Sequence, residues 1–354
     1  MIDRALTQRI ANAIARGVPT LARADEAPVP ETVPGDLVAI CTNAQLRVVT
    51  YTGLRPRVAL PVPEAVARPA WIAANVNSMG AILDPVADKL ASGGMLPGAA
   101  RKAAGVLLSA EAGALTGYLS QRVLGQFEFV IVDPASRARL LFVEPNIARA
   151  AVRLQADPEE LLTWIAFHEV THAVQFTAVP WLRPHLAGLL RELLDSLEMK
   201  VDARALLKLP TIEDVRETVG ALKEGGLVAA IGGARQRELL DRVQAVMGVV
   251  EGHAEHVMDV VGADALPSLA DLRAALDRRR NERPPLLALL ERLIGLDAKM
   301  RQYEDGKRFC DAVAATAGPA GLHRVFDGPE MLPSVAELHD PEAWIRRTGA
   351  HAMA

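Results

Sequence analysis

The most constraining feature of this chain is the pentapeptide His-Glu-Val-Thr-His at residues 168–172. Side chains four residues apart project from the same face of an α-helix, so His168 and His172 can bind one metal ion if this segment is helical. Glu169 lies beside them, where a carboxylate can take a proton from water that the ion has made acidic. The motif therefore predicts a zinc-dependent hydrolase built around a helix.

The residues before and after the motif predict where its helix begins and ends. Asp157 can cap the helix, Pro158 suits the first helical position, and the two acidic residues that follow favour the positive end of the helix. Pro180 ends the pattern. Steps of three or four residues join Leu161, Ile165, His168, His172 and Phe176. The two histidines thus continue the apolar stripe and are expected to point inward.

The composition predicts a mainly α-helical protein with a small β-hairpin or sheet. Half of the 354 residues are hydrophobic but only 4% are aromatic, and Ala, Leu and Val favour packed helices. Short β-rich runs at residues 127–132 and 140–143 predict a hairpin with a turn at Asp133. Helices are expected at residues 3–17, from the capping residue Asp36 onward, and at 63–90, 98–124 and 235–261. We expect a helical lobe at residues 1–124 and a catalytic region at 125–354, with an inserted helical segment near 180–234.

Charge argues against a nucleic-acid partner. The net charge is −4 and the isoelectric point is near 6.1, and the basic run at residues 278–280 is followed at once by Asn281 and Glu282. With only Cys41 and Cys310, the chain lacks a disulfide framework, and its first residues lack an apolar signal core. These features predict a cytoplasmic protein.

The stretch at residues 103–119 comes closest to a membrane segment. It is short for a membrane span and contains Glu111, so a buried helix of a water-soluble protein is the favoured interpretation. Gly113 and Gly117, four residues apart, would allow another helix to approach closely. We expect no membrane partner.

A zinc site with two histidines and water needs one more protein ligand, and Glu251 is the best candidate. On the helix predicted at residues 235–261, Glu251 and Glu255 interrupt an apolar stripe, and buried carboxylates require compensation. Glu251 can bind the ion, and Glu255 can accept the free ring N–H of a ligand histidine. Gly248 and Gly252 indicate that another helix approaches closely, and the helix that carries His168 is one candidate.

Other residues remain possible third ligands. A metzincin site is excluded, because Gln175 and Ala178 occupy the positions where that class has Gly and His. His253 and His256 lie off the apolar stripe of the helix predicted at residues 235–261, so they are expected at the surface or behind the metal ligands. The rival ligands are His253, His256, Asp259, Asp264 and Cys310.

Several separated motifs resemble a zincin-like hydrolase family of actinobacteria and chloroflexi, some members of which are associated with the biosynthesis of a deazaflavin coenzyme. The resemblance covers roughly residues 120–350. The residues that carry it are 145–147, 167–176, 179–183, 250–252, 301–306 with Phe309, and 344–347. The chain departs from the family pattern in two places: His253 stands where an aromatic residue is common, and Glu255 where Asp is common.

The resemblance implies a zincin-like fold with Zn²⁺ and with Glu251 as third ligand, and among peptidase classes the arrangement is similar to a gluzincin. The leading hypothesis is hydrolysis of a peptide or small amide with Glu169 as general base. Tyr303 is either a donor to the substrate oxyanion or a tyrosine at the helix surface or bonded to a neighbouring helix. The predicted hairpin either offers an edge strand to an extended peptide or is purely structural. The alternatives are an inactive metal-binding scaffold linked to coenzyme biosynthesis and a hydrolase of a small non-peptide metabolite.

Overall fold

The computed structural model describes residues 3–16, 35–92, 98–129, 131, 133, 135–196, 233–281 and 296–350. It divides into two compact units. The first contains Met1–Ala44 and Pro61–Ala173, and the second contains Gln45–Leu60 and Val174–Ala354. The expected division at residue 124 stays a prediction. Among the described helices, none is both long and apolar enough to cross a membrane.

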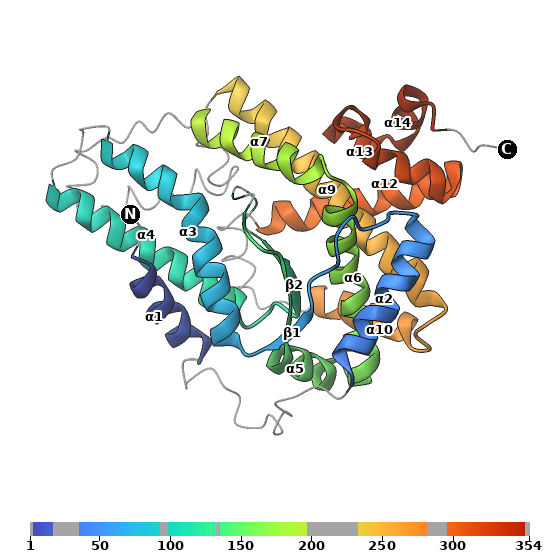
Figure 1. Ribbon diagram of the computed structural model, residues 1–354, viewed down its shortest axis with the longest axis horizontal. Helices are drawn as coiled ribbons and strands as arrows, with labels where there is room; N and C mark the ends of the chain where they lie inside the picture. Colours follow the sequence, from blue (N-terminus) through green and yellow to red (C-terminus); the bar gives the residue numbers. More distant parts are fainter. Residues whose placement is uncertain are drawn as a thin grey trace. The chain divides into compact units, whose positions relative to one another are not determined.

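The described structure is mostly helical with one small sheet, as the composition predicts (Figure 1). Much of the predicted insertion at residues 180–234 lies outside the described residues. The helices are α1 (Arg4–Ala15), α2 (Leu37–Thr52), α3 (Arg68–Ser92), α4 (Gly98–Leu119), α5 (Glu144–Leu154), α6 (Pro158–Ala178), α7 (Leu182–Ser196), α9 (Ala234–Ala263), α10 (Leu269–Asn281), α12 (Leu296–His323), α13 (Val335–His339) and α14 (Pro341–Thr348), with 3-10 turns η3 (Arg324–Phe326) and η4 (Pro329–Met331). The strands are β1 (Pro63–Val66), β2 (Gly125–Glu128) and β3 (Arg139–Val143).

The sheet belongs to the first unit and has the order β1-β3-β2. Strands β2 and β3 pair antiparallel, and the amide of Ser136 bonds to the carbonyl of Asp133, so the predicted hairpin and turn are confirmed. Part of the predicted run at residues 127–132 lies outside the described residues. Strand β1 corrects the prediction of a helix from residue 63, because this segment pairs parallel with β3 and the helix begins only at Arg68.

Close packing of α1 on α4 explains two of the glycines. A Cβ at Gly113 would lie 2.7 Å from the carbonyl oxygen of Thr7, and one at Gly117 would lie 2.7 Å from that of Ala11. Real Cβ atoms do not approach oxygen so closely, so only glycine lets these helices pack at this distance. The predicted close approach at Gly113 and Gly117 is confirmed, with α1 as the partner helix.

Short-range capping places α6. The Oδ1 atom of Asp157 accepts hydrogen bonds of 2.9 Å from the amides of Glu159 and Glu160, and the helix ends at Ala178, as predicted. The preceding helix α5 is anchored by Asn146. Its amide group donates to the carbonyls of Ser120 and Val123 and accepts a bond from Arg68, which ties α5 to the segment after α4 and to the start of α3.

In the second unit, α9 and α12 cross at three glycines. A Cβ at Gly252 would collide with the backbone of Gly306, and a Cβ at Gly306 would collide with the carbonyl of Gly248. The prediction that Gly248 and Gly252 admit a close helix is therefore confirmed. The close partner is α12, however, and not the helix that carries His168. The sequence pattern of α9 does not reveal which distant helix supplies the matching glycine.

Candidate metal centre

His168 and His172 lie on one face of α6 with their rings turned toward each other. Their Nε2 atoms are 3.1 Å apart, and the ring planes meet edge to face at 86°. Two nitrogens bound to one tetrahedral zinc ion at about 2.0–2.1 Å lie roughly 3.3 Å apart. The pair thus presents its nitrogens at the spacing that a shared ion requires.

The side chain of Glu169 is buried against strand β2. Only 7% of the residue is exposed, and its Oε2 atom accepts a 2.8 Å hydrogen bond from the backbone amide of Phe127. A Cβ at Gly125 would lie 2.6 Å from Glu169 Cγ and 3.0 Å from its Oε1 atom.

Burial, together with the charge of Glu169, raises the pKa of Cys41 to about 12, so this thiol stays protonated at neutral pH.

Within the described residues, one group of three side chains has the ligand types and spacing of a metal site: His168, His172 and Glu251. One ligand atom from each lies within 4.8 Å of the other two, and all three residues are partly accessible to solvent. Glu251 belongs to α9, and its neighbours Val250 and Gly252 are buried. Two imidazoles and one carboxylate form a donor set that suits zinc and leaves a fourth position for water.

Gln175 links α6 to α9, a role that the sequence alone did not predict. It is fully buried one turn after His172, and its side-chain amide donates a 2.9 Å hydrogen bond to the carbonyl of Val250. The same Nε2 atom lies 3.0 Å from Nδ1 of His253. Gln175 thus links the last turn of α6 to Val250 and His253 of α9, which lie just before and two residues after Glu251. The available signal was a polar residue at a position that helical spacing predicts to be buried.

The two histidines of α9 do not lie at the surface, which corrects one of the two places expected for them. His253 is 0% exposed and packs edge to face against Phe326 with ring centroids 4.9 Å apart. His256 is also buried, and its Nε2 and Nδ1 atoms lie 2.7 Å from the Tyr51 hydroxyl and from Asp311 Oδ1, respectively. Both ring nitrogens of His256 are therefore engaged within the second unit.

The remaining rival ligands also have other surroundings. Asp259 pairs with Arg273 and lies 3.2 Å from Lys307. Asp264 is exposed at the end of α9, and burial raises the pKa of the Cys310 thiol, which packs in the core. In the described part of the chain, none of these residues belongs to a three-ligand group with metal-site spacing.

Two further predicted residues, Glu255 and Tyr303, lie on α9 and α12. Glu255 is half-buried on α9, one turn after Glu251, and its expected bond to a ligand histidine stays a prediction. Tyr303 belongs to α12, but its side chain lies outside the described residues, so its role as an oxyanion donor also stays a prediction.

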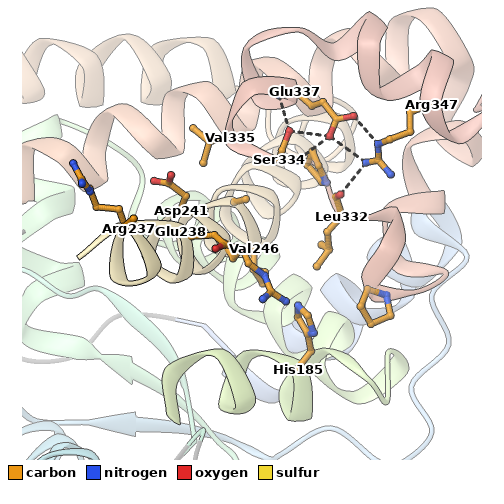
Figure 2. A pocket seen from close by; sticks show the side chains of 15 residues that line it. His185, Arg237, Glu238, Asp241, Val246, Leu332, Ser334, Val335, Glu337 and Arg347 are labelled. Atoms are coloured by element: carbon orange, nitrogen blue, oxygen red, sulfur yellow. Dashed lines mark hydrogen bonds and ion pairs between the residues drawn. The ribbon is translucent and has the colours of Figure 1, made fainter. Parts of the chain in front are cut away.

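The second unit also contains a cavity of about 650 Å³ that none of the predicted site residues lines (Figure 2). His185 of α7 faces it, and burial together with the charge of Arg242 lowers the pKa of this histidine. On the opposite wall, Arg347 pairs with Glu337 at 2.6 Å, and the amide of Ser334 donates to the same carboxylate. These contacts join α13 and its capping residue to α14.

Comparison with known proteins agrees with this chemistry. A crystal structure of a candidate hydrolase with a novel fold, from Chloroflexus aurantiacus, is similar to this chain with a TM-score of 0.70 and 28% sequence identity, over 99% of both chains. A comparison with curated proteins found no match. The model of the zincin-like metallopeptidases matches residues 2–345. Together, the two matches support a metal-dependent hydrolase. The chain belongs to the zincin-like metallopeptidase family.

Proposed function

We propose that this protein is a zinc-dependent peptidase or amidase that hydrolyses an amide bond. The observation that carries the proposal is the pair of facing Nε2 atoms on α6, 3.1 Å apart, beside the buried carboxylate of Glu169. A purely structural histidine pair would not need an acidic residue held next to it in an apolar environment, where an unused charge is costly. Metal-assisted hydrolysis gives all three side chains a role.

His168, His172 and Glu251 would hold the zinc ion. The contacts of Gln175 support Glu251 as third ligand, since they fix α6, one turn after His172, to the residue that precedes Glu251 on α9. We further propose that Glu255 accepts a ring N–H from one ligand histidine and so fixes its tautomer. When bound, zinc lowers the pKa of water toward neutrality and polarises a carbonyl group.

Glu169 is the proposed general base and then the general acid. Its Oε2 atom accepts a hydrogen bond from the amide of Phe127, and its Oε1 atom lies close to Gly125. The carboxylate takes a proton from the attacking water and later delivers it to the leaving amine nitrogen. Tyr303 of α12 is the proposed donor to the substrate oxyanion.

An extended peptide is the proposed substrate, with β2 as its binding edge. Among the described strands, β2 has β3 on one side only. An extended chain can add to such an edge through main-chain hydrogen bonds other than that of the Phe127 amide, which donates to Glu169, and side-chain pockets then give specificity. Both cysteines are free and buried, which supports the proposal that the protein works in the reducing cytoplasm.

Metal removal tests the proposed function. The zinc-loaded protein is expected to cleave peptides from a mixed library, to lose this activity when a chelator removes the metal, and to regain it when zinc is restored. Mass spectrometry of the products identifies the cleaved bonds. Bound zinc without turnover of any peptide or small amide would contradict the proposal. It would favour a metal-binding scaffold linked to deazaflavin coenzyme biosynthesis or a hydrolase of a small non-peptide metabolite.

A further inference from the structure

The backbone of β2 directs alternate residues toward Glu169. The amide of Val143 bonds to the carbonyl of Leu124, and the register pairs Gly125 with Phe142 and Phe127 with Leu140. In an antiparallel ladder, bonded and non-bonded pairs alternate, so the N–H groups of Gly125 and Phe127 point away from β3. The amide of Phe127 therefore needs a partner outside the sheet, and that partner is Glu169 Oε2 at 2.8 Å.

The other carboxylate oxygen of Glu169 lies over Gly125. A Cβ at this position would be 3.0 Å from Oε1, 2.6 Å from Cγ and 2.9 Å from Ile165 Cγ2. Any residue other than glycine would therefore push the side chains of Glu169 and Ile165 out of place. Residues 126 and 128 show the opposite arrangement: Gln126 bonds to Asn75 and Glu128 to Ser78, both of α3.

We propose that Gly125 and the amide of Phe127 form a positioning element for Glu169, in which the N–H fixes one carboxylate oxygen and the missing Cβ leaves room for the other. This inference rests on the proposed function for its kinetic consequence, but its geometric part stands without it. A carboxylate that the backbone already holds in place does not lose further side-chain entropy when it reaches its reactive position. A displacement of a catalytic group by about 1 Å can lower the rate about 100-fold.

Phe127→Pro removes the N–H without breaking a bond of the β2 and β3 ladder, because this N–H points away from β3, and proline is tolerated on such edges. The expected result is a fall in kcat of about 10- to 100-fold, with KM within about twofold of the wild type and zinc content unchanged. Phe127→Ala is the matched control. It removes the ring but keeps the N–H, so its kcat should exceed that of Phe127→Pro by about tenfold or more.

Gly125→Ala tests the same element if the proline variant does not fold or loses zinc. It should lower kcat by a similar factor with zinc retained. Gly188→Ala is its control, because a Cβ at Gly188 of α7 would meet no atom within 4 Å. An unchanged kcat in Gly125→Ala, or a raised KM with unchanged kcat in Phe127→Pro, would overturn the proposal. The second result would mean that the edge binds substrate but does not hold the base.

Amide hydrogen exchange gives a readout that is independent of activity. The Phe127 amide of the wild type should exchange at least about tenfold more slowly than in Glu169→Ala, because the carboxylate is its hydrogen-bond partner. The Val143 amide, which bonds within the sheet, should exchange equally in both proteins. Equal exchange at Phe127 would overturn the positioning role. A protein that protects Phe127 but cleaves no amide would refute the proposed function alone.

Discussion

Glu169→Gln is expected to lower kcat for amide hydrolysis by about 10²- to 10⁴-fold, the usual contribution of a general acid or base. Glutamine keeps the length of the side chain and an oxygen that can accept the 2.8 Å bond from the Phe127 amide, so the position of the side chain should persist. It cannot accept a proton from water at neutral pH. Steady-state kinetics on a cleaved peptide, with parallel measurement of zinc, separates lost chemistry from lost metal.

The matched control for this change is Glu255→Gln. Glu255 is half-buried on α9, and its proposed role is to orient a ligand histidine and not to transfer a proton, so its substitution should reduce kcat less. Full activity in Glu169→Gln would refute the mechanism. Equal losses in the two variants would show that a general change in charge around the site, and not proton transfer by Glu169, governs the rate.

Gly252→Ala is expected to destabilise the second unit by about 3 kcal/mol, the upper end of the range for overpacked cores. The new Cβ would collide with the backbone of Gly306 and would lie 2.5 Å from the amide nitrogen of Lys307. Backbone atoms of a packed helix cannot rotate away as the end of a side chain can. At about 2.1 cal/mol/K per residue over the 197 residues of the second unit, this corresponds to a decrease in Tm of about 7 °C.

Calorimetry of Gly252→Ala beside Gly188→Ala checks this expectation. Both changes add one methyl group to a helix, but only the first adds it against another backbone. Gly188→Ala should be neutral or slightly stabilising, since alanine has the higher helix propensity. An unchanged Tm in Gly252→Ala would mean that α9 and α12 are not packed as closely as the structure indicates.

Features that depend on neighbours in sequence were predicted well. The caps at Asp36 and Asp157 act on amides two or three residues ahead, and the turn after Asp133 closes within four residues. The spacing of the two histidines on α6 is likewise a local helical property. Such features can be predicted because the residues that form them stand together in the chain.

Features that depend on distant partners were not. Strand β1 is only four residues long, and its partner β3 is more than 70 residues away, so its prolines and short apolar run did not distinguish it from the start of a helix. The burial of His256 likewise depends on Tyr51, 205 residues earlier in the chain. Helical spacing predicts that one face of α9 is buried. It does not identify which distant residues cover the other faces of the helix.

Zinc content is the measurement that most directly tests the proposed metal site. Elemental analysis of the purified wild type beside His168→Ala and Glu251→Ala is expected to find about one zinc per chain in the wild type and almost none in either variant. Loss in both would support a site made by α6 and α9 together. Zinc retained in Glu251→Ala would contradict the proposed ligand set, and no zinc in the wild type even after zinc is supplied would contradict the metal-dependent mechanism itself.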